Sequence, residues 1–293
     1  MTLTFSAYER NHKQRLIEGL EWAKFQPQLF RAPVLRVRQQ VQHDHLAGLA
    51  LAANSHQGRL RWERAFLHHV ADALGDRLDG TGHKTAARLL TLIDAREAYN
   101  RPHDRPEVKH LRHHFGKALW GLNFIGMLEP ALYVSLRGQV SPTRRLFLWH
   151  VHAIAWRNSN DSIDHARAVA RQHGFSTLLP GAPALMTKTI TPGDLVRVSG
   201  YLNKSPRHQY SLAYKGEGAK PEHRRRSATG ANLARLHRHL DGLYLDDLAI
   251  AGGEGKAVLN AIKADALSHW RRHKAQPPAS RGLWFERGAG YAR

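Results

Sequence analysis

The sequence predicts an α+β protein in which an antiparallel β-sheet forms the core, with helices before and after it. Three observations support this fold class. The first hundred residues carry Ala, Leu and Arg at helical spacing, two apolar runs rich in β-formers follow a polar linker, and the chain then returns to helical periodicity. We expect four parts: a helical N-terminal domain over residues 1–105, the sheet-containing core over 106–216, a basic helical region over 217–270 and a basic flexible tail over 271–293.

The N-terminal part shows helical patterns that are broken by glycine-rich turns. Helices are expected over residues 5–24, 33–52, 58–75 and 83–98, with Gly and Asp punctuation at 75–82. A polar linker with two prolines, residues 100–106, then marks the domain boundary.

Two apolar runs, 131–136 and 146–156, predict an antiparallel hairpin that turns around Ser141 and Pro142. In the second run both alternating faces are apolar except at His150 and His152, which share one face. Such a strand is central in its sheet, so two imidazoles on it need specific partners.

The remaining elements follow from caps and periodicity. Thr191 as N-cap, Pro192 in the first turn and Asp194 as the third helical residue mark the start of a helix that ends before Pro206. We also expect helices over residues 107–121, 161–172, 229–240 and 255–272, a strand near 184–190 and an edge strand over 209–215.

Composition limits the possible chemistry. The 293 residues include 44 Lys and Arg against 24 Asp and Glu, a formal net charge of +20, which favours nucleic acid as the partner. With no cysteine, a metal would have to be bound by carboxylates and by some of the 21 histidines. No run is long and apolar enough for a membrane span, so we expect a cytoplasmic, nucleoid-associated protein without a membrane partner.

His150 and His152 are the sharpest candidate for a metal site. Two histidines at i and i+2 of a strand point to the same side, from where both rings can bind one divalent ion. His43 and His45, and also His237 and His239, have the same spacing, but they lie in polar helical segments and are interpreted as solvated surface.

Tyr201 and Lys204 form the second candidate. At i and i+3 they lie on one face of the capped helix, where the ammonium could favour the phenolate or hold a phosphate beside it. The simpler interpretation of this pair by itself is an amphipathic helix with a half-buried tyrosine.

Together, and in this order, the two motifs resemble those of the HUH endonucleases, and in particular the single-tyrosine initiators of rolling-circle replication. The resemblance covers about residues 107–216. It implies that His150 and His152 bind Mn²⁺ or Mg²⁺, and that Tyr201 attacks a phosphate of single-stranded or hairpin DNA, which leaves a 5′-phosphotyrosine and a free 3′-hydroxyl. It thereby implies nicking and rejoining that start the replication or mobilisation of a plasmid, phage or integrated element, with a host helicase as a further partner.

The third metal ligand of such sites is not found just before the histidine pair. A tight hairpin would place Glu129 opposite Ile154 and diagonal to His152, so Glu129 is the first choice, followed by Gln139 and by Asp161 or Asp164. Glu129 could equally be a solvated residue at the start of a strand.

Only one tyrosine is expected to act. The position four residues after Tyr201, where two-tyrosine enzymes carry the second, is Ser205. Tyr210 and Tyr214 have the two-tyrosine spacing, but they lie in an expected strand and are interpreted as packing residues.

Residues 201–240 hold the strongest charge bias, with nine basic and two acidic side chains. The basic residues expected to contact DNA are Arg207, Lys215, Arg224, Arg225 and Arg226. The alternative is a loop whose charges serve only solubility.

A phosphate-binding loop is not expected. The segment from Ala251 to Lys256 resembles one, but Ile250 stands where a glycine is required and Ala257 where Ser or Thr is required. We interpret it as a turn between helices and expect no nucleotide cofactor on this chain. The alternative to a nuclease is a non-catalytic basic DNA-binding protein in which His150 and His152 are core histidines.

Overall fold

The computed structural model describes the chain from residue 51 onward, with gaps. The described residues are 51, 53, 56–75, 87–100, 106–136, 145–179, 181–204, 208–213, 222–228, 230–240 and 243–274. The expected helices over 5–24 and 33–52, His43 and His45, and most of the expected tail lie outside these ranges.

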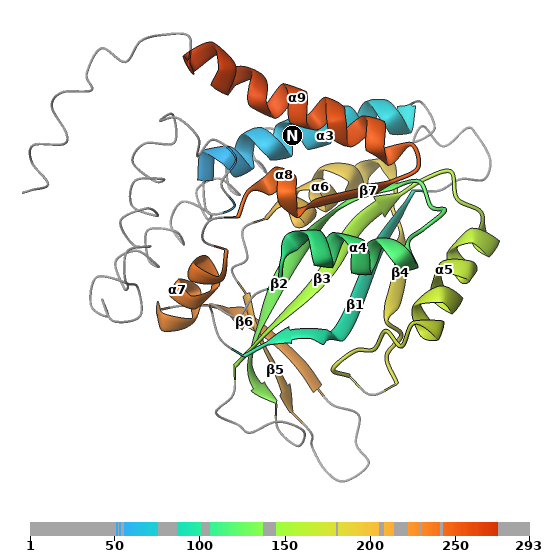
Figure 1. The fold of residues 1–293 in the computed structure, drawn as a ribbon, viewed down its shortest axis with the longest axis vertical. Helices are drawn as coiled ribbons and strands as arrows, with labels where there is room; N and C mark the ends of the chain where they lie inside the picture. Colours follow the sequence, from blue (N-terminus) through green and yellow to red (C-terminus); the bar gives the residue numbers. More distant parts are fainter. Residues whose placement is uncertain are drawn as a thin grey trace, which may run out of the picture.

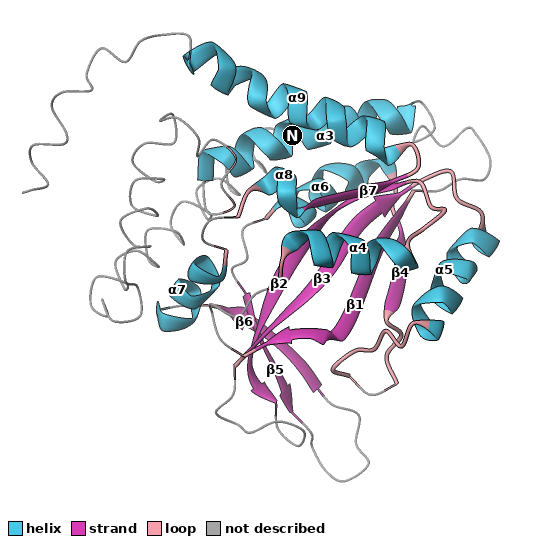
Figure 2. Cartoon of the chain, viewed as in Figure 1, coloured by secondary structure: helices cyan, strands magenta, loops and turns pink. Residues whose placement is uncertain are grey.

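A seven-stranded sheet forms the centre of the fold (Figures 1 and 2), with the order β4-β1-β3-β2-β5-β6 and with β7 paired to β2. The strands are β1 (Arg88–Tyr99), β2 (Phe124–Leu136), β3 (Leu146–Ala155), β4 (Leu185–Thr189), β5 (His208–Ala213), β6 (Glu222–Ser227) and β7 (Ala249–Gly252). All pairings are antiparallel except that of β2 with β5. The fold is therefore α+β with a mainly antiparallel sheet, as the sequence predicts.

Helices pack around this sheet. They are α3 (His56–Leu74), α4 (Val108–Ala118), α5 (Asn160–Gln172), α6 (Leu195–Asn203) after a 3₁₀ turn at Pro192–Asp194, α7 (Gly230–His239), α8 (Leu245–Leu248) and α9 (Gly255–Lys274). Helix α4 lies across one face of the sheet, whereas α3 and α9 pack against each other along one end of it (Figure 1).

Strand β3 is the centre of the core. It lies between β1 and β2, and all ten of its residues are buried. Trp149 and Val151 on one face have no exposed surface, as is typical of a strand covered on both sides. The central position predicted for this strand is confirmed.

The expected helix over residues 83–98 is wrong, because residues Arg88–Tyr99 form strand β1. Residues 89–93 are apolar except for Thr91, and a short run of this kind by itself suits a buried helix or a buried strand equally well. In the fold, its backbone pairs with β3 on one side and with β4 on the other, so the run forms a strand. The sheet therefore begins N-terminal to the boundary expected at residue 105.

Two further details differ from the sequence-based expectations. Strand β5 is an inner strand, because it pairs with both β2 and β6, and β6 is the edge. Strand β7 precedes the glycine-rich turn, which is therefore not a turn between two helices. The glycine there is explained by packing, since a Cβ on Gly255 would lie 1.8 Å from the carbonyl oxygen of Phe124.

His237 and His239 are buried rather than solvated, which corrects the sequence-based interpretation. Helix α7 packs one face against β2 and β3, and His239 stacks on Phe147 with ring centroids 4.1 Å apart. The indole N–H of Trp149 donates to His239 Nε2 at 3.0 Å. Burial lowers the pKa of His237 to about 4, so this histidine is neutral at pH 7.

Among the described helices, none combines the length and the apolar character that crossing a bilayer requires.

Candidate metal centre and tyrosine

The histidine pair lies in the middle of the sheet. His150 and His152 are 8% and 5% exposed, and their Nε2 atoms are 2.9 Å apart. Thr91 on the neighbouring strand β1 lies directly opposite His152, and its hydroxyl oxygen is 2.9 Å from Nδ1. The two buried imidazoles therefore contact each other, and His152 also contacts Thr91. Their further partners lie on α6 and β2.

Helix α6 carries Tyr201 to this face of the sheet. The start of the helix differs from the prediction, because a 3₁₀ turn at Pro192–Asp194 comes first and Asp194, not Thr191, is the N-cap of α6. The Asp194 carboxylate accepts hydrogen bonds from the Thr191 N–H at 3.2 Å and from the Thr191 hydroxyl at 2.7 Å. Tyr201 is partly buried, and its hydroxyl oxygen lies 2.9 Å from His152 Nε2. Burial, followed by the charge of Glu129, raises the pKa of Tyr201, so the free phenol is protonated at neutral pH.

Glu129 on β2 completes the cluster. It pairs directly with His150, and its Oε2 atom lies 3.8 Å from His152 Nε2. The sequence placed Glu129 opposite Ile154, a register that is wrong by four residues. Because side chains alternate with a period of two, an even shift leaves Glu129 on the face of the histidines.

Lys204 contacts both Glu129 and Tyr201. Its Nζ donates to Glu129 Oε2 at 2.6 Å and lies 3.8 Å from the centroid of the Tyr201 ring. The ammonium is thus over the face of the ring, as in a cation–π contact, and not beside the hydroxyl as the sequence suggests. At 7% exposure, its buried charge is balanced by the Glu129 carboxylate.

The donor set fits a divalent cation. One ligand atom from each of Glu129, His150 and His152 lies within 4.8 Å of the others. Two adjacent ligands at about 2.1 Å from one ion are about 3 Å apart, which matches the separation of the two Nε2 atoms. Burial lowers the pKa of both histidines, so both are neutral at neutral pH and each has a lone pair that a metal can use.

The other candidates for a third ligand do not join this cluster. Asp161 lies exposed in the first turn of α5, and Asp164 is exposed and pairs with Arg167 at 2.6 Å. Gln139 is outside the described residues.

Helix α3 supports the end of α6, a role that the sequence analysis missed. Arg59 is 4% exposed, and its Nη1 donates to the carbonyl oxygens of Asn203 at 3.0 Å and Lys204 at 2.9 Å. These are carbonyls that the helix end leaves unpaired. A signal existed in the sequence, because Arg59 and Glu63 lie at i and i+4 on the apolar face that also carries Phe66.

Glu63 lies under α6 as well. A Cβ on Gly200, the residue before Tyr201, would lie 2.9 Å from Glu63 Oε1. Burial raises the pKa of Glu63 to about 7, against the opposing effect of Arg59. Its Oε2 atom has no hydrogen-bond partner among the described residues.

Only one arginine of the basic run on β6 shares the face of the tyrosine. Residues that pair across neighbouring strands point to the same face of a sheet. Arg225 pairs with Tyr210 of β5, and Tyr210 pairs with Tyr133 of β2. Tyr133 in turn pairs with Leu146 of β3, which lies on the face of His150. The exposed Arg224 and Arg226 therefore point to the other face, and Arg224 forms an ion pair with Glu222 at 2.8 Å. The expected DNA contacts Arg207 and Lys215 lie outside the described residues.

Tyr210 packs in an aromatic group beside Arg225. Its ring stacks on His223 with centroids 5.0 Å apart and contacts Tyr133 at 5.5 Å. This agrees with its interpretation as a packing residue, while Tyr214 is outside the described residues.

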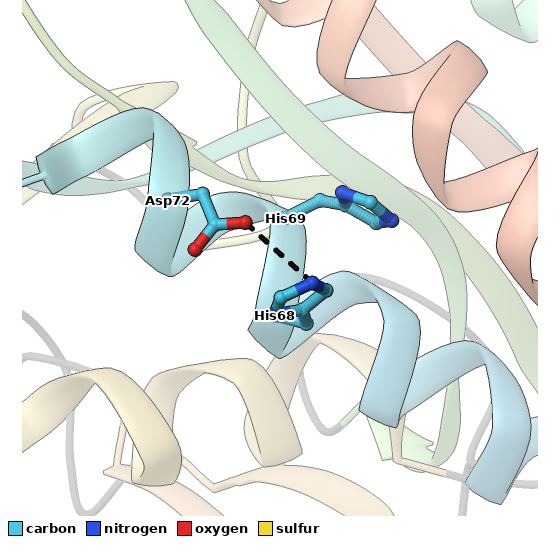
Figure 3. Close-up of side chains that lie close together, drawn as sticks. All are labelled: His68, His69 and Asp72. Carbon is cyan, nitrogen blue, oxygen red and sulfur yellow. Dashed lines mark ion pairs between the residues drawn. The ribbon is translucent and has the colours of Figure 1, made fainter.

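A second cluster of potential ligands lies on α3. Figure 3 shows His68 and Asp72 facing each other, 3.6 Å apart, with the ring of His69 turned away from them. His69 Nε2 is instead 3.5 Å from Asp265 on α9. We interpret the contact of His68 with Asp72 as a surface contact, because both side chains are 63% exposed.

Comparisons with known proteins add no relative: no protein-family model, curated protein or solved structure matches the chain.

Proposed function

We propose that this protein is a metal-dependent, site- and strand-specific DNA endonuclease of the HUH type. Through a covalent 5′-phosphotyrosine it would nick and rejoin DNA, and so start the replication or mobilisation of a plasmid, phage or integrated element. The observation that carries the proposal is the position of the Tyr201 hydroxyl, 2.9 Å from a histidine that belongs to a buried His, His, Glu cluster. These groups come from β2, β3 and α6, and Tyr201 lies 49 positions after His152 in the chain.

In the cleavage step, three residues of the chain would have separate roles. Tyr201 Oη forms a bond to the phosphorus, the bond from phosphorus to the 3′ oxygen breaks, and the phenol proton is lost while the leaving oxygen gains one. The link conserves the energy of the phosphodiester, so the reverse attack by the 3′-hydroxyl rejoins the strand. Arg225 supplies positive charge near the attacking oxygen, and Lys204 supplies it over the ring of Tyr201.

Glu129, His150 and His152 would hold Mn²⁺ or Mg²⁺. When bound, such an ion supplies Lewis-acid polarisation of the scissile phosphate.

The second candidate is a non-catalytic DNA-binding protein, and one observation favours it. The Lys204 ammonium is 2.6 Å from Glu129, and the histidines bond to each other, to Thr91 and to Tyr201, so the buried polar groups have partners without an ion. The two candidates differ in whether Tyr201 reacts.

The test is a nicking assay on circular single-stranded DNA with Mn²⁺. Tyr201→Phe removes one oxygen and almost no volume, so it should abolish nicking while DNA binding stays nearly unchanged. Lys204→Ala should leave slow cleavage, reduced about 10- to 1000-fold, because it removes charge and not the attacking atom. The matched control is Tyr210→Phe, which should nick as the unmodified protein does, and nicking by Tyr201→Phe at the full rate would overturn the proposal.

A further inference from the structure

A basic groove lies between α4 and α5. It has a volume of about 490 Å³ and is lined by two cations, three histidines and one tryptophan, namely Arg112, Lys117, His113, His165, His173 and Trp120. None of its lining residues is acidic.

The groove belongs to the helices on the side of the sheet opposite Tyr201. Ala98 of β1 pairs with Leu148, which shares the face of His150, so the neighbouring Glu97 points to the other face. His110 of α4 contacts that carboxylate at 2.9 Å, which places α4 on this second face. The groove is therefore separate from the candidate metal centre.

Trp120 is unusually exposed for its type. Its side chain is 79% exposed, against 38% for Met186 and 36% for Tyr244, the other exposed large hydrophobic residues of the described chain. Covering this indole with a flat partner would remove apolar surface from water, which is favourable. It follows the last turn of α4 and precedes Gly121, whose φ of +83° redirects the chain towards β2.

The residue types that line the groove favour one class of partner. Cations beside an accessible aromatic ring are the combination that binds single-stranded nucleic acid, in which phosphates contact the cations and an unpaired base stacks on the ring. A duplex keeps its base faces stacked and cannot use the indole in this way. An apolar peptide would need an apolar floor, and Val169 is the only aliphatic side chain in the lining.

We propose that this groove is a second binding site for single-stranded DNA, with one base on Trp120 and backbone phosphates on Lys117 and Arg112. That the strand is DNA rests on the proposed function, whereas recognition of a single strand rests on the groove itself. A segment bound here lies across the sheet from Tyr201, so the groove holds a part of the DNA other than the scissile phosphate.

The test measures the binding of a fluorescent dT₂₀ strand to the full chain in EDTA, so that no cleavage contributes. Trp120→Ala should weaken binding about tenfold, and Trp120→Phe should restore most of the affinity because phenylalanine also stacks. Lys117→Ala should lower the slope of log affinity against log salt by about 0.7, the value for one phosphate contact. Lys117 is preferred to Arg112 because Arg112 also interacts with Asp247.

Two controls separate stacking from general effects. Tyr244→Ala removes an exposed aromatic that does not line the groove and should bind dT₂₀ normally. An abasic strand of equal length offers no base, so the unmodified protein and Trp120→Ala should bind it equally well.

Normal dT₂₀ binding by both Trp120→Ala and Lys117→Ala would overturn the proposal, and so would an equal loss on the abasic strand. Nicking by the same variants, assayed in parallel, keeps the two proposals apart. If the unmodified protein does not nick DNA but Trp120→Ala weakens dT₂₀ binding, only the proposed function is contradicted. If the unmodified protein nicks DNA but both variants bind dT₂₀ normally, only the proposed groove site is contradicted.

Discussion

The Tyr201 hydroxyl oxygen lies 2.9 Å from His152 Nε2, although 49 positions separate the two residues in the chain. We assign the single proton of neutral His152 to Nδ1, where Thr91 Oγ1 lies at 2.9 Å. In this tautomer the single lone pair of Nε2 accepts the phenol O–H, and the same lone pair is the one that a metal would take. The contact therefore joins the expected nucleophile to the expected metal ligand.

The histidine pair gives the prediction for metal binding. His150→Ala with His152→Ala removes two of the three ligand atoms, so Mn²⁺ binding measured by calorimetry and nicking should be lost together. His237→Ala removes a buried histidine outside the site and should retain both. If the double variant still nicks single-stranded DNA with Mn²⁺, the site is assigned wrongly.

Arg225 gives a prediction for the DNA path. Arg225→Ala should weaken the binding of single-stranded DNA and slow nicking several-fold, because this guanidinium shares the face of Tyr201. Arg226→Ala, one residue along and on the opposite face, is the matched control and should have the smaller effect on nicking. Equal effects of both variants would mean that DNA does not follow the tyrosine face of β6.

Arg59 gives a prediction for the support of α6. Arg59→Ala leaves the carbonyl oxygens of Ala53, Asn203 and Lys204 without this donor, so the free energy of unfolding should fall by about 3 kcal/mol. At a temperature where the variant stays folded, nicking should fall while Mn²⁺ affinity is kept, because only the helix with Tyr201 loses its support. Arg61→Ala on the same helix is the control, and an equal loss of stability in that variant would remove the special role of Arg59.

Glu63 gives a prediction for stability against pH. Its pKa is raised from 4.5 to about 7 in the folded protein, so the unfolded chain releases this proton at lower pH. Ionising the buried Glu63 carboxyl therefore destabilises the folded protein. This destabilisation is absent below about pH 4.5, grows as the pH rises to 7 and is constant above pH 7. Glu63→Gln removes this destabilisation. The free energy of unfolding of the variant, relative to that of the unmodified protein, should therefore rise by about 2–3 kcal/mol from pH 5 to pH 8.

Urea unfolding at both pH values measures this difference. A gain that is the same at pH 5 and pH 8 would show that Glu63 does not titrate between them.

The elements with strong local signals could be predicted from the sequence. The hydrogen-bonded pair Thr191 and Asp194 lies at the 3₁₀ turn that leads into α6, within one turn of the predicted helix start, and alternation placed the two histidines on one face of β3. Strand β1 could not be predicted, because its apolar run fits either a helix or a strand until its two neighbouring strands are present. The burial of His239 likewise depends on Phe147 and Trp149, residues about 90 positions away.

The site shows the same division. The types of residue and their faces followed from spacing, since an even shift of register preserves the side of the sheet. The contacts of Lys204 with Glu129 and of Arg59 with the end of α6 join separate elements, and no local pattern encodes them.

The most direct test of the account is to trap the covalent adduct and map it. The protein is incubated with Mn²⁺ and labelled single-stranded DNA, digested with nuclease and protease, and the peptide that carries a nucleotide is sequenced by mass spectrometry. We predict a 5′-linked nucleotide on Tyr201 and no adduct from Tyr201→Phe. A nucleotide on Tyr210 or Tyr214, with Tyr201→Phe still fully active, would contradict the account.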